Sequence, residues 1–325
     1  MLVFHTPNLV DQLVPYSYRA RATVPSSHIE NSRVTHDLST IEKGDVVVLG
    51  KKHQLQDAVH LKENNIKFLV DIADHKFTVP EFKHWYATIP MASAITTTCE
   101  FLAMTIRKET GVKNIHVIPD PTERKRKDPD FLVKDIMTMC WYGADKNFEK
   151  VDWGLVQTEL SKVYPTQFMF MSNPIKPKRP HKRIKSHHYW LRDMSIKDRH
   201  LSAFDNVIEW SFEGQERMVD EADIVLIPVT NDKEAKSKGN NRPIDALQRG
   251  KFVLTNPGIN SYEILKNYIA VGNLCEEYKK AIDNPDKIND MIRKGQIEID
   301  KNYTPYSIGN KWKKVYEAIN NNNME

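Results

Sequence analysis

The sequence predicts two α/β domains, each built on a doubly wound parallel sheet, and three observations support this fold class. The chain has 325 residues, which is longer than one hydrophobic core usually accommodates. Short apolar runs alternate with amphipathic segments in two separate blocks, as in strand–helix–strand units. Between the blocks, residues 119–130 are rich in proline and charge and lose this periodicity, so we expect a linker there.

The first block predicts a domain over residues 1–120. Its apolar runs, which predict strands, cover residues 2–5, 45–50, 67–72, 94–98 and 114–120. Amphipathic segments at 54–64 and 100–110 predict helices between them. A strand that alternates with a helix at this spacing returns parallel to its neighbour, so we expect a parallel sheet.

The second block predicts a similar domain over residues 131–303. Its expected strands cover residues 136–143, 167–173, 206–211, 223–229 and 251–257, with a helix over 149–163. Four further helices are expected in the last third, over residues 261–266, 274–283, 285–301 and 306–319. Two doubly wound domains in tandem create a cleft at the carboxyl ends of their strands, where ligands bind in such folds.

Composition narrows the class of protein. The longest apolar runs are far too short to cross a bilayer, and the N-terminus lacks the basic and apolar regions of an export signal. Cys99, Cys140 and Cys275 are widely spaced and odd in number, which argues against a disulfide framework or a zinc site. We therefore expect a cytoplasmic protein without a transmembrane segment and without a bound metal.

Positive charge is concentrated in one segment. The net charge is +4, a mild excess that suits an anionic substrate or partner without requiring one. From Lys176 to Arg199 there are nine lysines and arginines but only two aspartates, with histidines and aromatic residues among them. Such a run is either a solvated loop or a surface that binds phosphates.

The clearest candidate site lies in residues 223–258. A polar loop follows the apolar strand that ends near Val229, and a short helix follows the loop, with Pro243 inside its start and Gly250 past its end. The start of this helix is therefore expected to point from the carboxyl end of the strand into the cleft. Its free N–H groups and positive dipole end make an anion site.

Charged and amide side chains surround this helix start. They are Lys236, Lys238, Asn240, Asn241 and Arg242, and their positive charges favour a diphosphate as the ligand. Asp245 lies in the first helical turn, where a carboxylate can accept hydrogen bonds from ribose hydroxyls. The alternative is that the loop is only solvated and that Asp245 only complements the helix dipole. Neither a Walker A motif nor GxGxxG is present, which disfavours P-loop and dinucleotide-binding proteins.

The segment DALQRG at residues 245–250 resembles the E-A-x-x-x-G segment of GT-B glycosyltransferases, in particular retaining, family 4-like enzymes that use nucleotide sugars. Such enzymes have two Rossmann-like domains that face a cleft, and they bind the donor diphosphate at a helix N-terminus. The resemblance implies that Asp245 replaces the glutamate that contacts the donor ribose. The family's other glutamate, eight positions earlier, falls on Ser237, which leaves the donor-sugar contacts and the stereochemical outcome open.

Further segments resemble the same family in order along the chain. WYGADKN is similar to the W-x-G loop beside the donor diphosphate, which implies donor contacts from Gly143 and Asn147. SYRAR resembles the S-x-R-x-R loop after the first strand, which implies acceptor contacts from Arg19 and Arg21. By the same resemblance the first domain binds the acceptor, the second binds the nucleotide sugar, and the last helix, residues 304–319, packs back on the first domain.

The implied chemistry is displacement of a nucleoside diphosphate from an anomeric carbon by a hexosyl- or pentosyltransferase, with a UDP-sugar as the favoured donor. The leaving diphosphate gains charge, so Lys238 and Arg242 are expected to stabilise it, and no cofactor is required. Asp71, Asp74 and His75 follow a strand of the first domain, on the acceptor side. In an inverting enzyme Asp74 or His75 is the candidate general base, and in a retaining enzyme they only position the substrates.

The basic segment bears on the acceptor. Its cations can neutralise phosphates while its aromatic rings stack on bases, so Lys178, Arg179, Lys182 and Arg183 are candidate acceptor contacts. We favour a hydroxylated base in DNA as the acceptor, which would make the protein similar to phage DNA-base glycosyltransferases that act in the host cytoplasm. The alternatives are an acceptor in surface-polysaccharide or lipid-linked glycan synthesis, a nucleotide-sugar epimerase, and a non-enzymatic nucleic-acid-binding protein.

Overall fold

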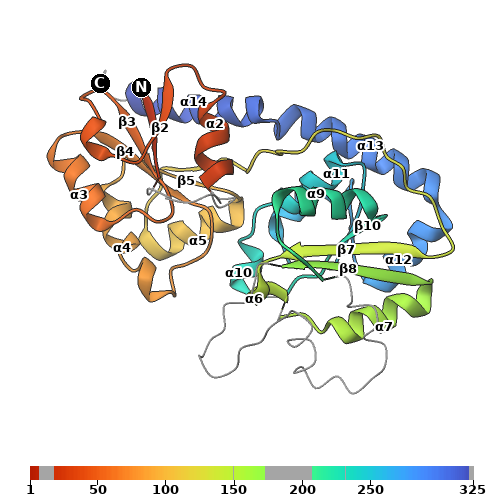
Figure 1. Ribbon diagram of the computed structural model, residues 1–325. Helices are drawn as coiled ribbons and strands as arrows, with labels where there is room; N and C mark the ends of the chain where they lie inside the picture. Colours follow the sequence, from red (N-terminus) through yellow and green to blue (C-terminus); the bar gives the residue numbers. More distant parts are fainter. Residues whose placement is uncertain (7–17, 149, 173–206, 231, 322–325) are drawn as a thin grey trace.

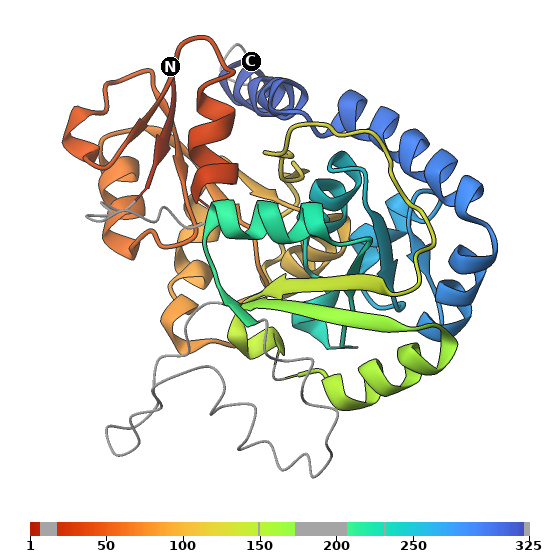
Figure 2. The same cartoon turned by 45° about the vertical axis from the view of Figure 1, so that its right-hand side comes forward.

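The computed structural model describes residues 1–6, 18–148, 150–172, 207–230 and 232–321. The strands form two six-stranded parallel sheets, one on each side of the connecting segment 118–136 along the chain (Figure 1). Helices pack on both faces of each sheet (Figures 1 and 2). The predicted fold class, two doubly wound parallel-sheet α/β domains, is therefore confirmed.

The strand order of each sheet reverses beside its first strand. The N-terminal sheet has the order β2-β1-β3-β4-β5-β6, and the C-terminal sheet has the order β12-β11-β10-β7-β8-β9. The N-terminal strands are β1 (Leu2–His5), β2 (Ser32–Thr35), β3 (Val46–Leu49), β4 (Lys67–Ile72), β5 (Ala94–Thr97) and β6 (Ile115–Val117). The C-terminal strands are β7 (Met137–Gly143), β8 (Thr166–Ser172), β9 (Val207–Glu209), β10 (Ile224–Ile227), β11 (Phe252–Thr255) and β12 (Ala270–Val271).

The helical elements connect these strands. In the N-terminal domain they are η1 (Arg19–Thr23), α2 (Val24–Ser26), η2 (Leu38–Thr40), α3 (Leu55–Glu63), η3 (Pro80–Phe82), α4 (Trp85–Thr88), η4 (Ile89–Met91) and α5 (Glu100–Thr110). The later ones are α6 (Asp145–Phe148), α7 (Trp153–Val163), α9 (Phe212–Glu221), α10 (Lys233–Lys236), α11 (Asn241–Gln248), η6 (Asn260–Leu265), α12 (Leu274–Asp283), α13 (Pro285–Asn302) and α14 (Pro305–Asn321). None of the helices described here is both long and apolar enough to cross a membrane.

Elements that were not expected from the sequence include β2, β12, α4, α6, α9, α10 and the short turns η1, α2, η2, η3 and η4. β2 is an edge strand with the sequence SRVT, so it lacks the apolar run that marks a buried strand. Half of the residues of α9 are charged, and its start is fixed locally, since the Ser211 hydroxyl accepts a hydrogen bond from the Gly214 N–H. The helix expected over 149–163 begins at Trp153, because Asp152 caps it by accepting from the Leu155 N–H at 3.0 Å.

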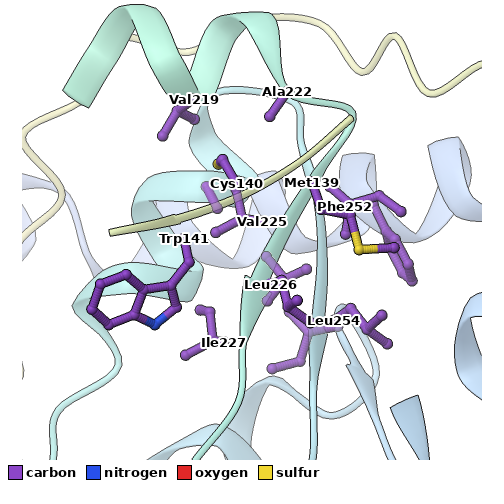
Figure 3. Close-up of a cluster of buried hydrophobic side chains, with 14 of the residues drawn as sticks. Met139, Cys140, Trp141, Val219, Ala222, Val225, Leu226, Ile227, Phe252 and Leu254 are labelled. Atoms are coloured by element: carbon purple, nitrogen blue, oxygen red, sulfur yellow. The ribbon is translucent and has the colours of Figure 1, made fainter. Parts of the chain in front are cut away.

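The core of the C-terminal domain is built from strands that are apolar on both faces. Figure 3 shows side chains of β7, β10 and β11 packed together, with Val219 and Ala222 from the end of α9 above them. The Trp141 ring at the end of β7 lies 5.2 Å from the Phe148 ring and 5.5 Å from the Trp153 ring, centroid to centroid. This packing fixes the end of β7, where the loops of the candidate site begin.

The connecting segment lies against the C-terminal domain. The Lys127 N–H donates to the Gln248 carbonyl at 2.9 Å, and the Gln296 amide donates to the Lys127 carbonyl at 2.7 Å. Gly250, just after α11, has φ +75°, and a Cβ there would lie 2.4 Å from the Asp128 carbonyl oxygen. Glycine is thus required both by the left-handed backbone and by the close approach of the segment.

The last helix leaves the C-terminal domain and lies along the N-terminal sheet (Figures 1 and 2). One stripe of α14 is buried with residues of β1 and β3, and its members are Ile308, Trp312, Val315 and Ile319. The Trp312 ring meets the Phe4 ring edge-on at 5.3 Å, and the Arg21 guanidinium lies 5.2 Å from the same indole. The two domains are therefore joined by two stretches of chain, the connecting segment and the passage into α14.

Truncation of Trp312 tests this docking. Trp312→Ala is expected to lower the free energy of unfolding by about 3–5 kcal/mol, the usual cost of removing a buried Trp ring. Tyr306→Ala is the matched control, because this side chain on the same helix is 67% exposed; we expect a change within about 0.5 kcal/mol. Urea or thermal unfolding of both variants measures the difference, and similar effects of the two would contradict the docking of α14.

Candidate functional site

A pocket opens at the carboxyl ends of β7 and β10, the neighbouring strands at which the order of the C-terminal sheet reverses. Its polar lining comes from the loops and short helices that follow these strands: Asn147, Lys150, Thr230, Glu234, Lys238 and Arg242. The fold thus brings three of the predicted donor contacts, Asn147, Lys238 and Arg242, into one pocket. It adds Lys150 and Glu234, which the sequence analysis did not single out.

Arg242, the second residue of α11, is anchored to the end of β7. Its Nη1 donates to the Tyr142 carbonyl at 3.3 Å. A Cβ on Gly143 would lie 2.9 Å from the Trp141 ring and 3.6 Å from this same nitrogen. The absence of a side chain at Gly143 therefore lets the Trp141 ring pack against the end of the strand and leaves room beside the guanidinium.

Lys238 reaches from the pocket to the N-terminal domain. Its Nζ lies 3.3 Å from Oδ1 of Asp74, and Lys51 contacts the other carboxylate oxygen. Burial raises the pKa of Asp74, but the charges of Lys238 and Lys51 outweigh this effect and hold the pKa well below its usual range. Asp74 therefore stays ionised and is a weak base, and it positions Lys238 in this arrangement.

Glu234 belongs to the same cluster of charges. Its carboxylate oxygens lie 2.9 Å from Lys76 Nζ, 3.3 Å from Lys150 Nζ and 3.6 Å from Lys238 Nζ. Lys150 also lies 3.2 Å from Asp232. Because Glu234 and Lys150 belong to the C-terminal domain and Lys76 to the N-terminal one, this cluster joins the two domains at the mouth of the pocket.

The cluster carries a net positive charge. Its cations are Lys51, Lys76, Lys150, Lys238 and Arg242, and its carboxylates are Asp74, Asp232 and Glu234. Such a surplus beside the start of a helix favours an anionic ligand with more than one negative charge. No local pattern marks Lys51 or Lys76, which lie on loops of the other domain, so the sequence offered no signal for them.

Five other predicted donor contacts lie outside the lining of this pocket: Gly143, Lys236, Asn240, Asn241 and Asp245. The Asn240 side chain is buried, with an exposed fraction of 2%. For Lys236, Asn240 and Asn241 a donor contact stays a prediction.

Asp245 is buried and engaged by the connecting segment. Its carboxylate accepts a hydrogen bond from the Thr122 hydroxyl at 3.0 Å and lies 3.7 Å from the Arg124 guanidinium. Burial raises the pKa of Asp245 to about 7, although Arg124 acts in the opposite direction. The predicted contact of Asp245 with ribose stays a prediction, and any such contact would compete with Thr122.

Arg21 and Asp71 lie inside the N-terminal domain. Arg21 Nη2 donates to Asp71 Oδ1 at 2.6 Å, and Arg21 also donates to the Ile118 carbonyl and lies 3.4 Å from Asp120. The Thr96 hydroxyl donates to Asp71 at 2.7 Å. This buried network ties η1 to β4 and to the start of the connecting segment, which argues for a structural role in place of the predicted acceptor contact.

Arg19 lies in a groove between the two domains. It donates to both Glu123 oxygens, at 2.6 Å and 2.7 Å, and its guanidinium lies 5.0 Å from the centre of the Phe212 ring. The groove is also lined by Trp210, by Val24 of α2 and by Ser27 and His28, which follow that helix. Acceptor binding by Arg19 stays a prediction. The other predicted acceptor contacts, Lys178, Arg179, Lys182 and Arg183, lie outside the described residues.

His75 lies next to Asp74 in the chain but is not part of the pocket lining. It is buried, and its ring meets the Phe77 ring at 5.9 Å. Burial lowers the pKa of His75, and the charge of Lys233 lowers it further, so the neutral imidazole is favoured. Within the described part of the chain, no group of three or more His, Cys, Asp or Glu side chains is arranged to hold a metal ion.

Comparisons with known proteins support the fold. No protein-family model matches the chain, and no curated protein matches it by sequence. Two solved structures of TarM match with TM-scores of 0.62 and 0.61 at 11% and 14% identity. The second of these is a variant from S. aureus in complex with fondaparinux, alpha-GlcNAc-glycerol and UDP. Each match covers 84% of this chain, which spans about half of TarM, 54% and 55% of its length.

A second group of similar structures concerns trehalose-6-phosphate enzymes. An E. coli protein bound with UDP-2-fluoro glucose matches with a TM-score of 0.59 at 11% identity, over 87% of this chain and 74% of the other. A trehalose-6-phosphate synthase studied for glycosyl transfer with retention matches with a TM-score of 0.61 at 9% identity, over 86% and 75%. The chain therefore has the two-domain, Rossmann-like GT-B fold that the sequence predicts.

The raised pKa of Asp245 predicts a pH-dependent effect on stability. The unfolded carboxyl loses its proton near pH 4, whereas the folded one keeps it up to a pH of about 7. The free energy of unfolding therefore falls as the pH rises from about 4 to about 7, because the buried carboxyl of Asp245 resists losing its proton. Asp245→Asn cannot ionise, so its melting temperature relative to wild type is expected to rise from pH 4 to 7 and then level off.

Melting curves of both proteins across this pH range measure the effect. Asp130→Asn, at a side chain that is 67% exposed, is the control for introducing an amide. A difference between Asp245→Asn and wild type that stays constant with pH would contradict a buried, protonated Asp245.

Proposed function

We propose that the protein is a glycosyltransferase that moves a sugar from a nucleoside-diphosphate sugar, with a UDP-sugar favoured, to an acceptor hydroxyl. The observation that carries this proposal is the pocket at the ends of β7 and β10, in which Lys238 and Arg242 lie beside the start of α11. A helix start and fixed cations at a switch point form a site suited to a diphosphate. Among the solved structures with a similar fold, one is bound to UDP and another to UDP-2-fluoro glucose, which supports this choice of ligand.

The proposed chemistry uses charge stabilisation of the leaving group. When the bond from the anomeric carbon to the diphosphate breaks, the electron pair stays on the phosphate oxygen, and negative charge grows there. Lys238 and Arg242 would stabilise that charge in a partly dehydrated pocket. Lys238 would exchange its contact with Asp74 for one with the diphosphate, because both are anions that it can pair with.

The state of Asp74 supports a retaining outcome. An inverting displacement needs a general base to take the proton of the acceptor hydroxyl. The charges of Lys238 and Lys51 outweigh burial and hold the pKa of Asp74 well below its usual range, and Lys51 keeps its contact with Asp74 when Lys238 turns to the diphosphate, so Asp74 accepts a proton poorly. His75 is buried outside the pocket lining. Of the two bases that the sequence suggests, neither is therefore well suited to inversion.

Ligand-induced stabilisation tests the donor. A thermal-shift screen would use UDP, GDP, ADP and their sugar derivatives, because a ligand that binds only the folded state raises the melting temperature. At one hundred times its Kd, a ligand adds about 2.7 kcal/mol of stability. We expect a rise with one nucleotide class, and no rise with any of them would refute the proposal.

Variants of the pocket locate the binding. Lys238→Ala and Arg242→Ala are each expected to weaken binding of the nucleoside diphosphate by about tenfold or more, the usual loss for a charged hydrogen bond. Lys162→Ala is the matched control, because this lysine lies on α7 with its side chain 65% exposed. Isothermal titration measures the three affinities, and equal affinities would place the diphosphate elsewhere.

For the acceptor, we propose a hydroxylated base in DNA, on the strength of the basic run between Lys176 and Arg199. Replacing Lys178, Arg179, Lys182 and Arg183 together by Ala is expected to weaken DNA binding and to flatten its dependence on salt. Fluorescence anisotropy with a labelled duplex at several salt concentrations measures both. DNA binding that is absent or insensitive to salt would favour a polysaccharide or lipid-linked acceptor.

A further inference from the structure

A small cavity lies in the N-terminal domain at the carboxyl ends of β1, β3 and β4, apart from the pocket at the ends of β7 and β10. The order of the N-terminal sheet reverses between β1 and β3, and ligands of open parallel sheets bind at such switch points. The volume of the cavity is about 10 Å³, which is room for one water-sized group. The N-terminal sheet thus has a candidate site of its own.

Two polar atoms at this cavity have no hydrogen-bond partner among the described residues. They are the Tyr18 hydroxyl and Nδ1 of His5; both side chains line the cavity, and both atoms are shielded from water. The Tyr18 side chain is only 4% exposed. A buried polar group without a partner costs stability, so native proteins usually supply one. Two such atoms at one cavity point to a small polar ligand group as their common partner.

The charged side chains in the described lining of the cavity are already paired. Arg21 Nη2 lies 2.6 Å from Asp71 Oδ1, and Lys51 contacts the carboxylate of Asp74. Each cation therefore has a carboxylate beside it, and the cavity has no surplus charge with which to hold an ion. The ligand group that fits here is uncharged.

The protonation states of Tyr18 and His5 define this group further. Burial raises the pKa of Tyr18 to about 12, so the phenol keeps its proton and donates a hydrogen bond. Burial also lowers the pKa of His5, although the charge of Asp57 opposes this, so the neutral imidazole, which has one accepting nitrogen, is favoured. A hydroxyl complements both side chains, because it accepts one hydrogen bond and donates another.

We propose that this cavity binds the hydroxyl end of the acceptor, a primary alcohol, with Tyr18 donating a hydrogen bond to its oxygen and His5 accepting one from it. This inference rests on the proposed function and adds the chemical class of the acceptor. Room for one water-sized group suits a hydroxymethyl group, whereas a hydroxyl on a ring carbon would bring the ring with it. A hydroxymethylated base and the free CH₂OH of a sugar share this chemistry.

The cavity is connected to the pocket that the diphosphate would occupy. Lys51 lines the cavity and contacts one oxygen of Asp74, and the other oxygen of Asp74 lies 3.3 Å from Lys238 Nζ. Lys238 in turn lines the pocket at the ends of β7 and β10. A chain of three charged side chains therefore joins the two sites, as the transfer of a sugar between their ligands requires.

The first variant, Tyr18→Phe, removes only the hydroxyl. Because this hydroxyl has no partner in the free protein, the melting temperature is expected to stay the same or rise. The KM for a primary alcohol is expected to rise about tenfold, with the Kd of the nucleoside diphosphate unchanged. Tyr306→Phe is the matched control, because this side chain is 67% exposed, and neither constant should change.

Two further positions test the cavity itself. His5→Phe removes the accepting nitrogen, whereas His5→Asn keeps an oxygen that accepts, so the second variant should lose less affinity for the acceptor. A Cβ at Gly50 would lie 3.8 Å from the Tyr18 ring and 3.4 Å from the His5 carbonyl oxygen, which are ordinary contacts. Gly50→Ala should therefore fold normally, narrow the cavity and raise the KM for the acceptor.

The assay measures release of the nucleoside diphosphate from UDP-glucose, GDP-mannose and ADP-glucose with three acceptors. They are a DNA duplex that contains 5-hydroxymethylcytosine, methyl glucoside, and methyl xyloside, which lacks the hydroxymethyl group. Use of the duplex or of methyl glucoside supports the inference and shows whether the alcohol comes from DNA or from a glycan. Equal use of methyl xyloside and methyl glucoside would overturn it.

The remaining outcomes separate the two proposals. If wild type binds a nucleotide but Tyr18→Phe and Gly50→Ala use the acceptor as wild type does, the inference fails and the proposed function stands. The same holds if Tyr18→Phe lowers the melting temperature, since its hydroxyl would then have a partner within the protein. If a nucleotide binds and neither primary alcohol is used, the inference fails and the donor site stands. If no nucleotide binds, both proposals fail.

Discussion

The ion pair between Lys238 and Asp74 is the contact on which the arrangement of the candidate site depends. It connects the loop after β10 to the loop after β4, two places in different domains. Partly buried charges are costly to remove from water, and they are tolerated when each has partners. Here Lys51 supplies the second partner of Asp74, and Glu234 the second partner of Lys238. The two sheets meet through a shared set of charges, at the point where an anionic ligand would add its own.

The chain itself limits how far the domains can separate. The connecting segment is hydrogen-bonded to the C-terminal domain through Lys127, and α14 buries Trp312 against the first strand of the protein. Both connections lie far in sequence from the cluster of lysines and carboxylates at the mouth of the pocket. They nevertheless join the same two domains. A ligand that takes Lys238 from Asp74 would therefore loosen one of several links and leave the domains attached.

Two carboxyls on or beside the connecting segment carry raised pKa values. Burial raises the pKa of Asp120 to about 6, with Arg21 opposing, and that of Asp245 to about 7, with Arg124 opposing. Burial is the cause in both, since each carboxyl is shielded from water where the segment leaves one domain and meets the other. Asp74 differs because its lysine partners outweigh the effect of its burial. The electrostatic character of each acid follows from its neighbours and not from its residue type.

The sequence by itself determined the fold class, and it predicted an anion site at the start of α11. Apolar runs as short as those of β7, β10 and β11 favour buried strands over helices, and Pro243 and Gly250 bracket α11 by local backbone preference. Tertiary structure alone decided which side chains meet. Lys51, Lys76 and Glu234 carry no local signal, and Arg21, which sequence resemblance assigned to the acceptor, is buried against Asp71. The physical reason is that strand and helix periodicity is set by neighbouring residues, whereas an ion pair between domains depends on how two separately folded sheets pack together.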